Sequence, residues 1–157
     1  MRVLLLSLLA AHGAACASPA HPSPPLSPQA REVVAQVNAL RALHGLPPLA
    51  PAPALAQAAR AHAAEQAALG RISHDGADGS VLMERLERVG YAALAAGENV
   101  ASGWSEPSGV TKGWWESPGH RENLLRSQTS EIGVGAARDE AGRAYWTLIV
   151  AAPDREV

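Results

Sequence analysis

Cysteine is nearly absent from this chain of 157 residues: Cys16 is the single one, and phenylalanine does not occur. One thiol cannot form an internal disulfide, so the sequence does not have the disulfide framework common in small secreted domains. Basic residues do not gather in runs and the formal net charge is −2, which argues against the basic face of a nucleic-acid-binding protein. Aromatic residues are few, so the place of each tryptophan is informative.

A long hydrophobic run is also missing. The apolar stretch VLLLSLLAA at residues 3–11 is about half the ~20 residues that a transmembrane helix needs, so a permanent membrane span is not expected. It follows Arg2 and precedes small residues, which is the layout of a secretory signal peptide over residues 1–17.

Two endings of this signal fit the sequence. Ala-Cys-Ala at residues 15–17 suits ordinary cleavage before Ser18. GAAC at residues 13–16 instead resembles a bacterial lipoprotein box, in which Cys16 becomes the acylated first residue of the mature chain. Either route removes the free thiol, so the protein is expected to be secreted, periplasmic or in the cell envelope, and lipid-anchored through Cys16 in the second case.

Proline-rich residues 18–28 then predict an extended spacer, and residues 29–157 one domain large enough to bury a core without disulfides.

Helical spacing dominates the first half of this domain. Ser27 and Pro28 are N-cap and first-position signals, and Gly45 is a stop signal, for a helix with one apolar stripe: Val33, Val34, Val37, Leu40 and Leu43. An alanine-rich helix from Ala54 to Gly70 has small side chains that suit close packing. A short helix is expected over residues 80–89.

The second half reads as strands around two short helices. Residues 96–103 predict a strand, and residues 131–138 alternate apolar and polar or small residues as a half-buried strand does. The turn DEAG at 139–142 joins the strand at residues 131–138 to a more apolar strand over residues 143–151. Helices followed by a closing hairpin predict an α+β fold with helices packed on a small antiparallel sheet.

GWWESPGHRENLL at residues 113–125 contains a helix corner. Ser117 precedes Pro118 and is therefore pushed out of helical geometry, so the helix carrying Glu116 ends there and a new one begins. His120 becomes about the third residue of that new helix, where the helix dipole disfavours a protonated ring. A neutral imidazole is the form that a metal ion or a general base requires.

Four motifs occur in order, together with Asn38, Arg41 and AARAHAA upstream: SHDGADGS at 73–80, GENVASG at 97–103, the corner at 113–125, and EIGVGAA at 131–137. This arrangement resembles the CAP superfamily of cysteine-rich secretory, antigen 5 and pathogenesis-related 1 proteins, and in particular its bacterial branch without disulfides. The resemblance covers about residues 29–152 and implies an α-β-α sandwich. The missing disulfides are the departure from the animal and plant branches.

The resemblance further implies a cleft with two histidines and two glutamates, which correspond here to His74, Glu98, Glu116 and His120. Many bacterial relatives have asparagine in place of Glu116. Trp114 and Trp115 are adjacent and cannot share a helix face, so one is expected in the core and Trp115 is assigned to the cleft.

Three interpretations of these residues stay open. His74 and His120 are candidate ligands of zinc or another divalent ion, held weakly or facultatively. Glu98 or Glu116 is a candidate base, so a metal-dependent, peptidase-like hydrolase is the alternative function. The four side chains could instead form a hydrogen-bonded cluster that only ties loops to the sheet. No nucleophile elbow, His-Glu-x-x-His helix or reactive cysteine supports catalysis independently.

The remaining histidines and tryptophans of the domain have simpler expected roles. His62 is interpreted as a helix-packing residue and His44 as a helix-end residue, while Trp104 and Trp146 are expected to pack, Trp146 in the core. The sequence therefore favours an extracytoplasmic binding module for an envelope component, a lipid or a protein. Its expected contact with the membrane is only a lipid anchor at Cys16, and nucleic acid is not an expected partner.

Overall fold

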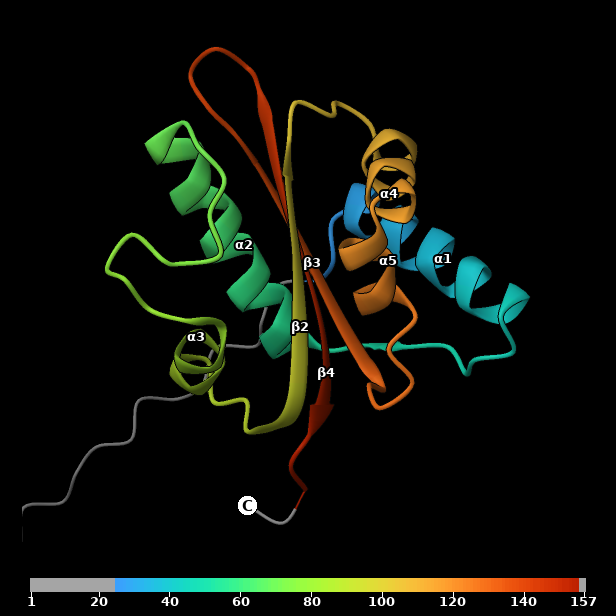
Figure 1. Ribbon diagram of the computed structural model, residues 1–157. Helices are drawn as coiled ribbons and strands as arrows, with labels where there is room; N and C mark the ends of the chain where they lie inside the picture. Colours follow the sequence, from blue (N-terminus) through green and yellow to red (C-terminus); the bar gives the residue numbers. More distant parts are fainter. Residues whose placement is uncertain (1–24, 156–157) are drawn as a thin grey trace, which may run out of the picture.

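The computed structural model describes residues 25–155, in which a four-stranded sheet has helices on both faces (Figure 1). One side carries α2 (Pro53–Leu69) and α3 (Leu82–Arg88), and the other carries α1 (Pro28–Leu43), α4 (Pro107–Glu116) and α5 (Pro118–Leu124). The predicted α+β class and α-β-α sandwich are confirmed. The predicted signal peptide, Cys16 and most of the spacer lie outside the described residues.

The sheet order is β1-β3-β4-β2, with bounds Ala50–Pro51, Glu131–Arg138, Ala144–Pro153 and Ala93–Ser102. The three longer strands are antiparallel, as predicted, but the two-residue β1 runs parallel to β3. The loop after α1 forms this extra strand when the amide of Ala50 donates to the carbonyl of Ser130 (2.9 Å). Two residues are too short for an alternating pattern, so the sequence did not reveal β1.

Capping signals placed the helix ends well. Ser27 Oγ accepts a hydrogen bond from the amide of Ala30 (3.1 Å), and α1 begins at Pro28, which leaves the predicted spacer one residue shorter. Leu43, however, is 82% exposed although it was assigned to the buried stripe. At about 100° of rotation per residue, Leu43 lies far around the helix from Arg41, which is the residue that continues the buried face.

Two cores sandwich the sheet. The larger lies between the sheet and the α1, α4 and α5 layer and contains Trp114 and Trp146, both predicted as core residues. The smaller lies under α2 and α3. The alanine-rich face of α2 approaches the sheet so closely that a Cβ atom on Gly133 would overlap the backbone of Leu55 and Ala56. The predicted close packing of this helix is therefore confirmed.

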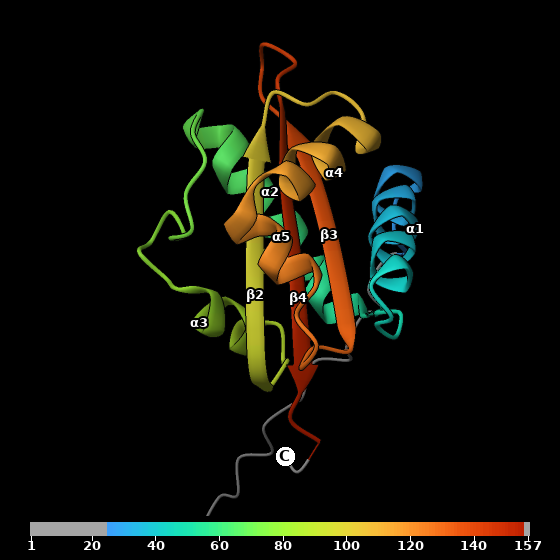
Figure 2. The same cartoon turned by 45° about the vertical axis from the view of Figure 1, so that its right-hand side comes forward.

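β2 is an edge strand, and side chains from the helices above it cap part of its outer edge. Trp114 Nε1 donates to the carbonyl of Val100 (3.3 Å), and Asn123 Nδ2 donates to that of Glu98 (3.1 Å). Capping of this kind blocks pairing with a further strand. The same contacts bring α4 and α5 against the strand that carries Glu98 (Figure 2). Within the described residues, no helix combines the length and apolarity that crossing a membrane requires.

Candidate functional site

Glu98, in the middle of β2, is the centre of the candidate site. Successive strand residues point to opposite faces, so Glu98 faces the α2 and α3 layer while Asn99 faces α5. The Glu98 side chain is 3% exposed, and both of its oxygens are engaged: Oε2 accepts from Arg85 Nη2 (2.6 Å), and Oε1 lies 2.9 Å from His74 Nδ1. A buried carboxylate needs such partners, and here it has two.

His74 lies in the loop between α2 and α3, and its side chain is 61% exposed. An ionised carboxylate only accepts hydrogen bonds, so Nδ1 of His74 carries the hydrogen that points at Glu98. In the neutral ring Nε2 then keeps its lone pair. The pair therefore holds a solvent-accessible imidazole in one tautomer, an arrangement that also occurs around metal-binding histidines.

Two side chains of α2 hold the backbone of the loop that carries His74. His62, which is buried as its packing role predicted, has Nε2 2.8 Å from the carbonyl of Ser73. The amide of Ser73 donates to Gln66 Oε1 (3.3 Å). His62 Nε2 also lies 3.9 Å from Glu98 Oε1, so this histidine belongs to the margin of the site and not only to the core.

His120 is the third residue of α5, as predicted, and is half-buried. Burial lowers the pKa of His120 below its ordinary value, and the nearby charge of His74 lowers it further. The side-chain amide of Asn99 donates to the carbonyl of His120 (3.0 Å), which fixes α5 against β2. His120 therefore lies within reach of the charge of His74, and its environment favours the neutral form of its ring.

Glu116 is placed differently from the other three. It is the last residue of α4, its side chain is 63% exposed, and its carboxylate lies 3.7 Å from the ammonium of Lys112, one turn earlier. Within residues 25–155, no hydrogen bond or ion pair joins Glu116 to His74, Glu98 or His120. Of the four predicted side chains, His74 and Glu98 are in direct contact, His120 is joined to His74 only by an electrostatic interaction, and Glu116 lies apart.

Trp115 lines an apolar groove of about 390 Å³ between α1 and α4. Ala39, Leu40 and Leu43 line the same groove. Its ring packs at 5.3 Å from the His44 ring, and the Arg121 guanidinium lies 5.6 Å above it. Trp114, its neighbour, faces the core, in agreement with the prediction that one of the two adjacent tryptophans is a core residue.

Arg85 is the site residue that sequence reasoning missed. It is buried, with 6% exposure, and contacts both Glu98 and the backbone of the His74 loop. A signal was present: Leu82, Arg85 and Val89 follow helical spacing, so Arg85 shares the inward face of its short helix. A charged residue on such a face needs a buried partner, and Glu98 is that partner.

The donor set fits a weakly held divalent ion only in part. His74 has one oriented nitrogen with a free lone pair, and the environment of His120 favours a neutral ring, which suits ligation. Among the residues that the structure describes, however, no three His, Cys, Asp or Glu side chains are grouped to bind one metal ion. Glu98 is already committed to Arg85 and His74, which leaves two imidazoles as protein ligands.

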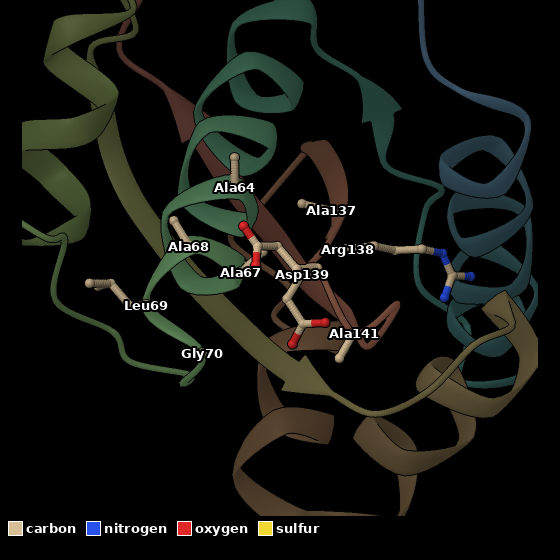
Figure 3. A pocket seen from close by; sticks show the side chains of 10 residues that line it. Ala64, Ala67, Ala68, Leu69, Gly70, Ala137, Arg138, Asp139 and Ala141 are labelled. Atoms are coloured by element: carbon tan, nitrogen blue, oxygen red, sulfur yellow. The ribbon is translucent and has the colours of Figure 1, made fainter.

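A larger groove, about 690 Å³, lies between the end of α2 and the β3–β4 hairpin (Figure 3). Alanines make up half of its lining residues, and the side chain of Arg138 points away from it. Asp139 is engaged by the amide of Arg143 (2.9 Å) and the hydroxyl of Tyr145 (3.2 Å). This groove gathers no set of convergent titratable side chains, so the edge of β2 remains the candidate site.

A family model matches residues 34–150 of the chain, and its description is the cysteine-rich secretory protein family, CAP. The uncharacterized protein YkwD of Bacillus subtilis is 39% identical over 64 residues, which is 41% of this chain and 24% of that protein.

Solved structures agree on the fold. An extracellular protein containing an SCP domain, from Bacillus anthracis, has a TM-score of 0.73 and 30% identity, over 82% of this chain and 45% of that one. An outer surface protein of Borrelia burgdorferi has a TM-score of 0.73 at 22% identity, over 79% of this chain and 92% of that one. The chain thus spans less than half of YkwD and of the Bacillus anthracis protein.

Proposed function

The chain belongs to the CAP family of cysteine-rich secretory proteins, and on that premise we propose that it acts outside the cytoplasm as a binding module. Its relatives include proteins described as an extracellular protein and an outer surface protein, which supports an extracytoplasmic location. The expected ligand is an envelope component, a lipid or a protein, and the edge of β2 with His74 and His120 is its expected contact.

One observation carries the choice of binding over catalysis: both oxygens of Glu98 are occupied, and Glu116, the other candidate base, contacts Lys112 on α4 and not the other site residues within the described part of the chain. A general base has to accept a proton from the reacting group, and a buried carboxylate clamped by a guanidinium and an imidazole is poorly available for that task. The site instead presents an oriented imidazole nitrogen on His74 beside His120, which is an arrangement for donating lone pairs or accepting hydrogen bonds.

A divalent ion such as zinc fits this donor pair as a weak, facultative cofactor. His74 and His120 would hold it, while Glu98 would orient His74 and take no direct part in ligation. When bound, the ion would supply a Lewis-acidic position for an oxygen atom of the ligand.

The apolar groove between α1 and α4 supports a lipid among the candidate ligands. Leu40, Leu43 and Trp115 form apolar wall, and Lys112 stands at the same groove with a cationic head. Such a groove suits an acyl chain, because the chain is removed from water there.

The test is zinc titration of the purified protein by calorimetry, comparing His74→Ala and His120→Ala with His44→Ala as a matched control. Wild type and the exposed His44 variant are expected to bind one zinc ion weakly, and the two site variants to lose at least about tenfold in affinity. Either of two results would mean that the side chains form only a structural cluster. In the first, zinc affinity is unchanged in both site variants. In the second, wild type binds no zinc and both variants have lower melting temperatures. Peptide hydrolysis by wild type that disappears in the same variants would identify the alternative hydrolase.

A further inference from the structure

Arg85 of α3 contacts both the loop that carries His74 and the carboxylate that binds the His74 ring. Its Nη2 donates to Glu98 Oε2 (2.6 Å), and its Nη1 donates to the carbonyls of His74 (2.9 Å) and Ser80 (2.8 Å). One planar guanidinium therefore reaches the edge strand and both ends of the loop segment from His74 to Ser80. The group is 6% exposed, so these contacts are formed away from bulk solvent.

These three bonds act on His74 through two routes. The bond to the His74 carbonyl holds the backbone from which the imidazole projects. The bond to Glu98 Oε2 turns the carboxylate so that its other oxygen, Oε1, receives Nδ1 of the same imidazole. Because the guanidinium fork is rigid and planar, the bond from Nη1 to the His74 carbonyl also fixes the direction of Nη2, and with it the position of the Glu98 carboxylate.

We propose that Arg85 is the positioning residue of the His74 site: it sets the tautomer and the direction of the His74 ring without touching the ligand. This inference rests on the proposed function, because it assigns Arg85 to the same binding site. The guanidinium is covered by the loop and by β2, so its effect on any ligand passes through Glu98 and His74.

The α2 side of the loop complements this role. His62 and Gln66 hold Ser73, the residue before His74, through its carbonyl and its amide. The backbone on both sides of the His74 side chain is thus fastened, to α2 before it and to α3 after it. A loop held in this manner loses little conformational freedom when a ligand binds, which favours affinity.

Arg85→Lys is the informative variant, because lysine keeps the positive charge but is a single point donor and not a fork. Arg88→Lys is the matched control: it lies on the same helix, is exposed, and its guanidinium contacts only the loop side chains of Asp78 (2.7 Å) and Ser80 (3.4 Å) among its described hydrogen bonds. The tautomer of His74 is read from the ¹⁵N shifts of its two ring nitrogens at about pH 7.5, roughly one unit above the ordinary histidine pKa, and zinc affinity is read by calorimetry.

Wild type and Arg88→Lys are expected to show the hydrogen of His74 on Nδ1 alone. Arg85→Lys is expected to show a mixture of the two tautomers and a zinc affinity lower by about 10- to 100-fold, the usual effect of removing a residue that orients a ligand. A single Nδ1–H tautomer with unchanged zinc affinity in Arg85→Lys, even with lowered stability, would overturn the proposal.

If Arg85→Lys does not fold, Arg85→Gln combined with Glu98→Gln avoids a buried carboxylate without its partner. Compared with Glu98→Gln alone, the double variant is expected to show the tautomer mixture, and identical His74 spectra in the two would overturn the proposal. The tautomer measurement needs no metal. Absence of zinc binding by wild type would therefore defeat the metal part of the proposed function and leave this inference to be decided by the spectra.

Discussion

At the scale of single residues, two glycines of β3 decide how closely α2 can approach the sheet. A Cβ atom on Gly135 would overlap the backbone of Ala59 and Arg60, and one on Gly133 the backbone of the preceding turn of α2. Neither neighbour is a side-chain tip that could rotate away. The spacing between these layers is therefore set by the absence of two side chains.

Gly135→Ala is expected to lower the free energy of unfolding by about 3 kcal/mol or more, because α2 must shift along its length to accommodate one methyl group. Gly119→Ala is the control: a Cβ there meets nothing within 4 Å, and its place in α5 predicts no loss and a gain of up to about 1 kcal/mol. Urea unfolding of the three proteins measures both. A loss below about 1 kcal/mol in Gly135→Ala would show that the layers can separate easily.

Residue-level prediction from the sequence succeeded where a residue's partner was close in the chain or its face was set by periodicity. The burial of Trp114 and the place of His120 at the start of α5 follow from adjacency and from the Ser117–Pro118 signal. Arg85 was missed because its partner, Glu98, is remote in sequence. The exposure of Glu116 was not foreseeable either, since it depends on the angle at which α4 ends.

At the scale of elements, the site depends on how α5 is joined to β2. Asn99 donates to the carbonyl of His120 (3.0 Å), while Asn123 donates to the carbonyl of Glu98 (3.1 Å) and to Asn99 Oδ1 (2.9 Å). Gly97 makes room for this contact, because a Cβ there would press on the amide group of Asn123. The motif residues Gly97, Glu98 and Asn99 therefore have different tasks on one strand.

The place of His120 in this junction predicts a loss of stability in acid. The pKa of His120 is lowered by burial and by the charge of His74, so the unfolded chain, with a histidine pKa of about 6.5, binds the proton more strongly than the folded protein does. Above pH ~6.5 this histidine contributes no pH dependence, and as the pH falls below that value its protonation favours unfolding.

Wild type is accordingly expected to lose more stability between about pH 7.5 and about pH 5 than His120→Gln, which has no such group. Urea midpoints at the two pH values, for both proteins, measure the difference. Because other groups titrate in this range, including His74, only the difference between wild type and variant is assigned to His120. Equal losses in the two proteins would show that protonation of His120 does not oppose folding.

The elements themselves were largely predictable. The capping signals Ser27 and Pro28 located the start of α1, and Gly70 located the end of α2. Alternation located β3 over the same residues that the structure assigns to it. β2 begins at Ala93, three residues before the expected start, because its pairing with β4 extends into alanines that have no alternation to reveal a strand. Pairing partners, unlike periodicity, are not visible in a local stretch of sequence.

At the scale of the whole molecule, two apolar cores take the place of disulfides. Each face of the sheet is covered by its own helical layer, so β4, in the middle, is buried over most of its length. The candidate site lies at the edge of this assembly, where β2 has only one neighbouring strand and side chains from both layers can meet around it. The buried interior and the candidate site are thus separate parts of the molecule.

The predicted lipid anchor concerns Cys16, which lies outside the described residues. The mature N-terminus is expected at Cys16, carrying acyl chains, or at Ser18, and intact mass spectrometry of protein made in a bacterial host distinguishes the two.

If the mature chain begins at an acylated Cys16, Cys16→Ala should move the protein from the membrane fraction to the medium or periplasm. If it begins at Ser18, the same substitution should leave the fractionation unchanged. An extended spacer over residues 18–27 would hold the domain roughly 30 Å from an acylated end, far enough for the edge of β2 to meet envelope ligands. A mature chain that still begins at Met1 would contradict both endings and, with them, the extracytoplasmic location on which the proposed ligands depend.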